Sequence, residues 1–238
     1  MNLCIDIGNT RYKAGFFSKH QLVDVFESHA EIELETIMKW NNQYSFSRII
    51  ISSVRILNEG LIKALSDQFD VTVVSTSMNL PIEISYETPE TLGVDRVLGA
   101  IGAQNIFPSK NTLSIDAGTC ITYDLVVDGI FIGGAISPGV QMRLDAMHKF
   151  TDKLPNLKKN DQIVTFGTST TSSMLMGAES GAIEEMKGFI RTFSDQIENL
   201  KVILTGGDAS FFEGHVENAT FAAPNLVLIG LNKVLLET

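Results

Sequence analysis

The feature of this sequence that most limits its possible folds is an internal repeat. Residues 3–10 read LCIDIGNT and residues 113–120 read LSIDAGTC, so one pattern recurs after 110 residues. In each copy a short apolar segment runs into Asp-x-Gly and a hydroxyl-bearing turn, and a second apolar segment follows. Self-similarity of this kind indicates a duplicated structural unit. We therefore expect two similar halves, residues 1–110 and 111–238.

The segments after each copy predict a meander of three strands in each half. In the first half, the return strand is expected at residues 14–17 and the third strand at 21–26. In the second half, the corresponding strands are expected at 121–127 and 130–132. The Asp-Gly pair between them is a strong signal for a tight hairpin.

Alternating helices and strands are predicted after each meander. Apolar strands ending in small residues span 48–53 and 201–207, and shorter buried strands are expected at 71–74 and around 221–223. Apolar residues at intervals of three and four predict core-facing helices between them. These residues are Ile62, Leu65 and Phe69 in the first half and Ile183, Met186, Ile190, Phe193, Ile197 and Leu200 in the second. The plan is that of an α/β protein with a duplicated ribonuclease-H-like fold, mixed sheets and a cleft between the halves.

Composition and charge exclude several classes of partner. The 238 residues are 44% hydrophobic and 19% charged, which is typical of compact globular proteins with a full core. Eighteen Lys and Arg against 28 Asp and Glu give a net charge of -10. Nucleic acid and anionic membranes would be repelled by this charge, so neither is expected as a partner.

The start of the chain and its cysteines favour a cytoplasmic protein. The first residues, MNLCID, lack the basic and apolar regions of a signal peptide, and no apolar run approaches the roughly 18 residues of a membrane span. Cys4 and Cys120 are too few for a disulfide scaffold. We expect both as small buried side chains in a reducing compartment.

The repeated Asp-x-Gly motif has the chemistry of a phosphate-binding turn. Glycine lets backbone N–H groups approach an anion, a hydroxyl adds a donor, and a carboxylate can hold a hydrated magnesium ion. Lys13, three residues after Thr10, would add a positive charge to the first turn. Two such turns facing each other across a cleft would bind a nucleoside triphosphate. The alternative is that both motifs only form tight hairpins.

Two further glycine-rich segments are candidates for the same site. Residues 204–209 (LTGGDA) predict a strand ending in a double glycine, which would support an adenine or ribose or form an ordinary turn into a helix. Residues 133–139 (GGAISPG) are predicted to close the second hairpin and start a helix with proline at an early position. Val140, Leu144 and Met147 would share one face of that helix. Its N-terminus would point at a phosphate or substrate, or would serve packing alone.

A further helix is predicted to begin at Asp95 and Arg96, with apolar residues 94, 97, 98 and 101 on one side. Asp95 then falls in the first turn, where an acidic side chain stabilises the helix dipole and could also act in a cleft. The four histidines are scattered without the spacing of metal ligands.

These motifs together resemble the type III pantothenate kinase family. The resemblance rests on Asp6–Thr10 with Lys13, Tyr86 ahead of Gly93–Arg96, Asp116–Thr119, Gly133–Gly139 and Thr205–Asp208, in order along almost the whole chain. It implies the superfamily of acetate kinase, sugar kinases, Hsp70 and actin, which agrees with the duplication. It also implies a homodimer that transfers the γ-phosphate of ATP to pantothenate, the first committed step toward coenzyme A.

By motif position, the resemblance implies a role for each segment. The implied ATP-binding residues are Asp6, Ile7, Gly8, Asn9, Thr10, Arg11, Tyr12, Lys13 and Thr119. The implied pantothenate-binding residues are Tyr86, Gly93, Val94, Asp95, Arg96 and Thr170, with Asp95 as the general base. Asp116 is implied to bind a monovalent cation, K⁺ or NH₄⁺, and Asp6 to hold Mg²⁺ through water.

Three positions depart from the family pattern. Val94 stands where the family commonly has alanine, and Cys120 and Ile121 replace commoner small and hydroxyl residues. None of the three removes a carboxylate or donor that the mechanism needs, although Ile121 cannot make a hydroxyl contact.

Two other functions fit the same superfamily. One is a regulatory or filament-forming ATPase, and the other is a sugar kinase. Both usually carry larger insertions than a chain of 238 residues accommodates.

Overall fold

The computed structural model describes residues 1–160, 163–216 and 221–237, and the chain forms two compact units. Unit 1 consists of Met1–Ser109, Asp128–Gly133 and Asn225–Thr238, and unit 2 of Lys110–Val127 and Gly134–Pro224. This division differs from the halves expected at 1–110 and 111–238 in two places, since the tip of the second hairpin and the C-terminal segment belong to unit 1. The halves are defined by a repeat in the sequence, whereas the units are defined by which residues pack together in space.

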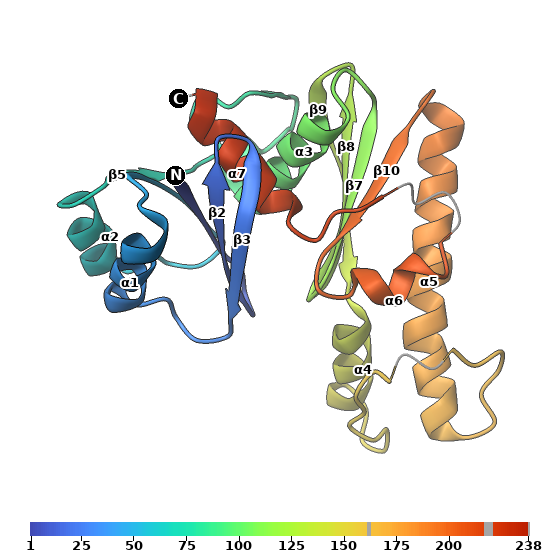
Figure 1. Ribbon diagram of the computed structural model, residues 1–238. Coiled ribbons are helices and arrows are strands. Elements are labelled where there is room, and N and C mark those ends of the chain that lie inside the picture. Colours follow the sequence, from blue (N-terminus) through green and yellow to red (C-terminus); the bar gives the residue numbers. More distant parts are fainter. Residues whose placement is uncertain (161–162, 217–220, 238) are drawn as a thin grey trace. The chain divides into compact units, whose positions relative to one another are not determined.

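Unit 1 is built on a five-stranded sheet with the order β3-β2-β1-β4-β5 (Figure 1). β1 runs antiparallel to β2 and parallel to β4, so the sheet is mixed as expected. The strands are β1 (Asn2–Ile7), β2 (Tyr12–Ser18), β3 (Gln21–Ser28), β4 (Arg48–Ser53) and β5 (Asp70–Val73). The helices and short elements of this unit are α1 (Leu34–Tyr44), α2 (Glu59–Ser66), β6 (Glu83–Ile84), η1 (Pro89–Thr91), α3 (Val94–Ile106) and α7 (Leu226–Glu237).

The second sheet repeats the first one strand by strand. It has six strands in the order β6-β9-β8-β7-β10-β11. The five strands β9-β8-β7-β10-β11 match β3-β2-β1-β4-β5, with β7 antiparallel to β8 and parallel to β10, and β6 adds an edge strand parallel to β9. The strands are β7 (Thr112–Ala117), β8 (Cys120–Val127), β9 (Ile130–Pro138), β10 (Lys201–Thr205) and β11 (Phe221–Ala222). The helices of unit 2 are α4 (Val140–Lys149), α5 (Thr170–Gln196) and α6 (Ala209–Glu213). The same topology in both sheets confirms the duplicated fold.

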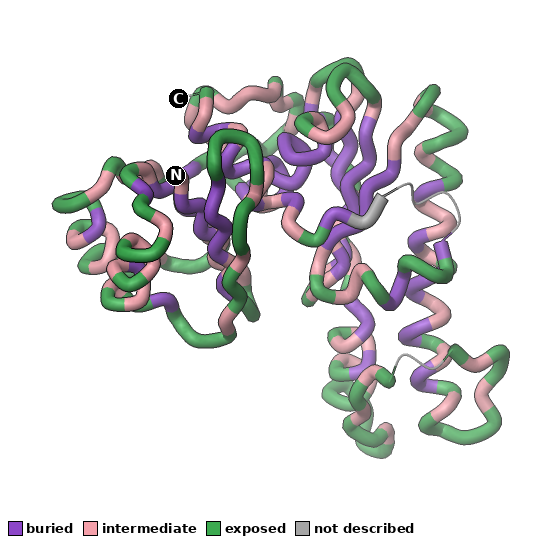
Figure 2. Tube along the Cα trace, in the orientation of Figure 1, coloured by how far each residue is buried: buried purple, intermediate pink, exposed green. Residues whose placement is uncertain are grey.

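Each unit has its own apolar core, and Figure 2 shows the buried residues concentrated along the strands. In unit 1, side chains of α1 and α2 pack with Leu3 and Ile5 of β1 on one face of the sheet. In unit 2, the predicted stripe Ile183, Met186 and Ile190 on α5 is buried against β7 and β8, as expected from its spacing.

The C-terminal helix belongs to unit 1 because it packs closely on α3 (Figure 1). A Cβ on Gly102 would lie 2.3 Å from the carbonyl oxygen of Leu226, and one on Gly230 would lie 2.0 Å from that of Leu98. Two helix backbones can approach this closely only where side chains are absent at the contact.

Two expectations from the sequence are wrong in detail. The strand expected at 130–132 runs to Pro138, and α4 starts only at Val140, so Pro138 ends a strand and does not occupy an early helix position. Gly134 allows the strand to continue, since a Cβ there would lie 1.7 Å from the carbonyl oxygen of Tyr123. Cys4 is buried, but Cys120 is only half-buried because it begins β8 directly after the turn.

Membrane insertion by a helix finds no support in the described residues: none of their helices combines the length and apolar character that spanning a bilayer requires.

Candidate functional site

The first Asp-x-Gly turn carries a row of polar side chains across the sheet of unit 1. Asp6 pairs with Ser52 of β4 on one side and with Lys13 of β2 on the other. The hydroxyl of Ser52 donates to Oδ1 of Asp6 at 2.7 Å, and Nζ of Lys13 lies 3.0 Å from a carboxylate oxygen of Glu27 on β3. Because directly paired residues point to the same face, these four side chains form one hydrophilic strip.

The turn itself is short and exposed. The backbone N–H of Gly8 donates to the carbonyl of Arg11 at 2.9 Å, and residues 9–11 between them are exposed. Ile7 and Tyr12 flank this turn with side chains on the opposite, apolar face, where Tyr12 is almost fully buried. Of residues 6–13, therefore, Asp6 and Lys13 have side chains on the hydrophilic face, and residues 9–11 are exposed to solvent.

The second turn, residues 116–119, lies against the double-glycine segment of unit 2. Asp116 pairs with Thr205 of β10, the counterpart of the pairing between Asp6 and Ser52. Gly206 has φ +97°, and a Cβ there would lie 2.3 Å from the carbonyl oxygen of Ala117 and 2.4 Å from Oδ1 of Asp116. The backbone N–H of Asp208 donates to that same carbonyl at 2.9 Å.

The segment before α4 closes the other side of this turn. The N–H of Gly139 donates to the carbonyl of Thr119 at 3.1 Å, and a Cβ on Gly139 would lie 2.1 Å from the carbonyl oxygen of Gly118. The three glycine-rich segments that the sequence singled out thus meet around residues 117–119. α4 begins immediately after Gly139, so its free N–H groups lie beside the turn, an arrangement suited to anions.

A polar cluster that the sequence analysis missed links α4, α5 and the end of β9 beside this turn. Arg143 on α4 donates from Nη2 to both carboxylate oxygens of Glu185 on α5, each at 2.8 Å, and from Nε to the carbonyl of Pro138 at 2.8 Å. The hydroxyl of Ser137 donates to Glu185 at 2.5 Å. Burial raises the pKa of the nearby Tyr123 well above its ordinary value. Lys159 also pairs with Asp208.

Asp95 lies in the first turn of α3, as expected. Its Oδ1 accepts a hydrogen bond from the backbone N–H of Arg96 at 2.9 Å. Burial raises the pKa of Asp95 above its ordinary value, and the charge of Arg96 offsets only part of this effect. A carboxylate with a raised pKa is a better proton acceptor near neutral pH than an ordinary surface carboxylate.

Arg96 and Tyr86 gather beside Asp95 within unit 1. Arg96 is only 7% exposed, and its guanidinium lies 5.9 Å from the ring centre of Tyr86 and 6.0 Å from that of Phe131. Gly133, at φ +100°, gives the Tyr86 ring room, since a Cβ there would lie 3.2 Å from it. The guanidinium thus lies beside both rings, and a guanidinium in such surroundings is suited to bind a carboxylate.

Two other expected site residues, Thr170 and Val94, and the departure at Ile121 have identifiable surroundings. Thr170 is the first residue of α5, next to a capping box between Ser169 and Ser172. Val94 is buried at the start of α3. Ile121 is 1% exposed in the core of unit 2, which explains why an apolar residue is compatible with this position.

Within residues 1–160, 163–216 and 221–237, no group of three His, Cys, Asp or Glu side chains could hold a metal ion. A metal ion at Asp6 would therefore take most of its ligands from phosphate and water, which is how Mg²⁺ is commonly bound with nucleotides.

Comparison with known proteins places the chain in a family. The sequence model of type III pantothenate kinase matches residues 2–192. A type III pantothenate kinase of Christiangramia forsetii is 40% identical over 240 residues, covering 99% of this chain and 98% of its own. Another, of Flavobacterium psychrophilum, is 36% identical and covers 98% of each chain.

Solved structures support the fold. A conserved putative Baf family transcriptional activator from Campylobacter jejuni superposes with a TM-score of 0.65 at 21% identity, covering 99% of this chain and 98% of its own. A putative N-acetylmannosamine kinase from Listeria monocytogenes gives 0.56 at 11% identity, with coverage of 99% and 98%. At these identities the likeness shows a shared actin-like fold alone, whereas the sequence relatives match end to end. The chain belongs to the type III pantothenate kinase family.

Proposed function

We propose that this protein transfers the γ-phosphate of ATP to the primary hydroxyl of pantothenate, producing 4'-phosphopantothenate in the first step of coenzyme A biosynthesis. The family match over residues 2–192 and the full-length relatives support the reaction. The structural observation that carries it is the group of Asp95, Arg96 and Tyr86: a half-buried acid with a raised pKa beside a buried cation that lies near two aromatic rings.

Pantothenate, an anion with a terminal hydroxyl, fits this group chemically. Arg96 would bind the carboxylate of pantothenate, and Tyr86 would orient Arg96 and cover the apolar part of the substrate. Asp95 would accept the hydroxyl proton as the hydroxyl oxygen forms its bond to the γ-phosphorus. The bond between the γ-phosphorus and the bridging oxygen then breaks, and ADP leaves.

The two turns supply groups for ATP. Lys13 and the N–H groups of residues 9 and 10 would bind phosphate oxygens in unit 1. Thr119 and the start of α4 would do so in unit 2. The carboxylate oxygens of Asp6, beside the hydroxyl of Ser52, are hard donor atoms that fit a hydrated Mg²⁺ ion. A bound Mg²⁺ ion would neutralise phosphate charge.

A monovalent cation, K⁺ or NH₄⁺, is proposed at Asp116. The carboxylate of this residue and the hydroxyl of the paired Thr205 are oxygen donors, the type of ligand that such cations prefer. The proposed effect is to offset repulsion between Asp116 and the phosphates of ATP.

We further propose that the working enzyme is a cytoplasmic homodimer, in which Thr170 contacts pantothenate held mainly by the other subunit. The 27-residue helix α5, which starts at Thr170, offers a long surface for such a contact. We also propose that residues 1–110 and 111–238 are the duplicated halves from which the fold arose.

One assay separates the proposed reaction from the alternatives. ADP release is measured with pantothenate, with hexoses and with no acceptor, each in potassium and in sodium buffer. The proposal predicts release that requires pantothenate and is faster in potassium. Release that requires a hexose would indicate a sugar kinase, and slow release without any acceptor would indicate a regulatory ATPase.

A further inference from the structure

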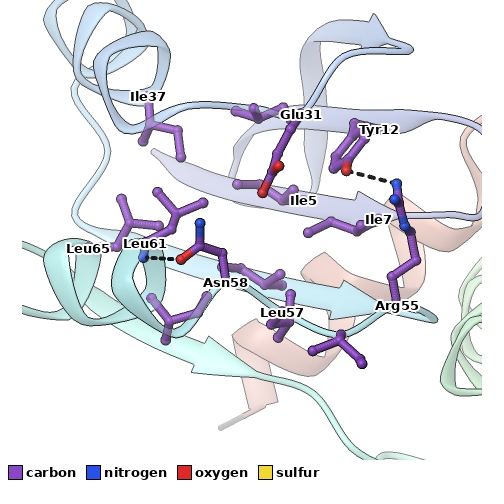
Figure 3. Close-up of a pocket in the computed structure, with 14 residues that line it drawn as sticks. Ile5, Ile7, Tyr12, Glu31, Ile37, Arg55, Leu57, Asn58, Leu61 and Leu65 are labelled. Carbon is purple, nitrogen blue, oxygen red and sulfur yellow. Dashed lines mark hydrogen bonds between the residues drawn. The ribbon is translucent and has the colours of Figure 1, made fainter.

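Unit 1 contains a pocket that the proposed reaction does not use. It lies between the sheet and the helices α1 and α2, on the face opposite Asp6, and encloses a volume of about 100 Å³ (Figure 3). Its interior is apolar, formed by residues of β1, β4, α1 and α2. The principal apolar residues are Ile5, Ile7, Ile37, Ile51, Leu61 and Leu65.

The rim of the pocket carries two charges of opposite sign. Figure 3 shows the carboxylate of Glu31 pointing into the space and the guanidinium of Arg55 beside Tyr12 at the other end. Nη1 of Arg55 donates to the hydroxyl of Tyr12 at 2.9 Å. Across the described residues, the side chain of Glu31 makes no hydrogen bond or ion pair, and that of Arg55 has no acceptor besides Tyr12. The two charges are therefore both available to a ligand.

Two neighbouring residues add to this rim. Oδ1 of Asn58 accepts the N–H of Leu61 at 3.2 Å and caps α2, which leaves the amide nitrogen of Asn58 as a donor pointing into the same space (Figure 3). Ile56, next to Arg55, is fully exposed although it is a large apolar side chain that lines the pocket. A ligand that covered Ile56 would remove apolar surface from water.

We propose that this pocket binds a free α-amino acid with a branched aliphatic side chain. Its ammonium group pairs with Glu31, its carboxylate with Arg55, and its side chain enters the apolar interior. A fatty acid would leave the carboxylate of Glu31 without an ion-pair partner. An alkylamine would leave the guanidinium of Arg55 without one. Cavities of roughly 150 Å³ accommodate a benzene ring, so about 100 Å³ suits a side chain of four carbons better than a large aromatic one.

The experiment is a calorimetric titration of the full-length protein with L-leucine, in the absence of ATP and pantothenate. The expected result is one leucine bound per chain, with glycine, 4-methylpentanoate and isopentylamine each binding at least about tenfold more weakly, because each lacks one of the three recognised groups.

Variants test the two charged contacts. Glu31→Gln and Arg55→Gln change exposed side chains, so both proteins are expected to fold, and each should weaken leucine binding about tenfold or more. Lys39→Gln is the matched control, since it removes an exposed charge of α1 that lies outside the pocket. Its affinity for leucine should equal that of the unmodified protein.

Three results would overturn the proposal: no binding at about 10 mM leucine, unchanged affinity in both pocket variants, or 4-methylpentanoate binding as tightly as leucine. Because neither substrate is present, the outcome does not depend on whether the kinase reaction is assigned correctly.

Discussion

At the scale of single residues, a substitution at Asp95 can distinguish a catalytic role of this residue from a purely structural one. Asparagine keeps the shape of the side chain but removes the proton acceptor, so Asp95→Asn should lower kcat by about 10²- to 10⁴-fold while ATP still binds. Asp6→Asn, by contrast, should weaken the binding of magnesium and ATP. Both variants are compared by steady-state kinetics and by nucleotide titration. A kcat for Asp95→Asn above about a tenth of the original would contradict the role of general base.

The raised pKa of Asp95 also fixes the sign of its effect on stability. A group with a folded-state pKa above the unfolded one contributes stability at pH values below the unfolded pKa, and this contribution is lost as the pH rises through the folded pKa. At neutral pH the charged carboxylate therefore lowers the free energy of unfolding. The Asp95→Asn protein should unfold at an equal or higher temperature at this pH. A marked loss of thermal stability at pH 7 would instead indicate that the charge supports the fold.

Gly93 offers a second residue-scale test. A Cβ on Gly93 would lie 2.5 Å from Oδ1 of Asp95, and its φ of -59° is ordinary, so alanine there would displace the carboxylate without straining the backbone. We expect Gly93→Ala to lower kcat at least about tenfold, because small errors in the placement of a catalytic group are costly. Thermal unfolding should remain within a few degrees of the original. Unchanged kinetics would show that Asp95 tolerates displacement.

At the scale of elements, the second phosphate turn depends on the backbone of Gly206. An alanine there meets a carbonyl oxygen at 2.3 Å and must adopt φ +97°, so Gly206→Ala should lower the stability of unit 2 and the affinity for ATP together. The matched control is Gly177→Ala on α5, where the space around a Cβ is open and alanine should stabilise the helix by about 0.5 to 1 kcal/mol. Thermal unfolding and nucleotide titration of both variants measure the contrast. Equal effects at the two glycines would contradict it.

The elements also show what could be predicted from the sequence. The repeat predicted both meanders, and regular spacing predicted α5 and the start of α3, because these signals are local. The pairing of Arg143 with Glu185 joins residues far apart in the chain and has no local signal. Pro138 was misplaced because a proline suits the end of a strand as well as the start of a helix.

At the scale of the whole molecule, contacts between distant segments could be predicted from the sequence only in part. The bond between Ser52 and Asp6 follows from the parallel register of β1 and β4, and aligning the two halves would have revealed it beside the pairing of Thr205 with Asp116. The C-terminal helix is mostly apolar, with Asn232, Lys233 and Glu237 as its polar residues, and its sequence did not indicate that it packs within unit 1. The roles inferred from family motifs remain predictions, since motif position shows identity of residues and not contact with a ligand.

The proposed dimer is a prediction about the whole assembly. It can be tested because each active site would contain residues of both subunits. If Thr170 completes the site of the other subunit, a mixed dimer of Asp95→Asn and Thr170→Ala chains has one site with both defects and one intact site. Unfolding is not needed to form such dimers when the two chains are co-expressed with different affinity tags.

Co-expression should therefore restore activity that neither variant has alone at low pantothenate, to about a quarter of the original if chains pair at random in a twofold dimer. If both residues act on substrate within one chain, every site in the mixed dimer carries one defect, and activity stays at the level of the single variants. A protein that light scattering shows to be monomeric and fully active, with a mass near 26.1 kDa, would rule out both arrangements.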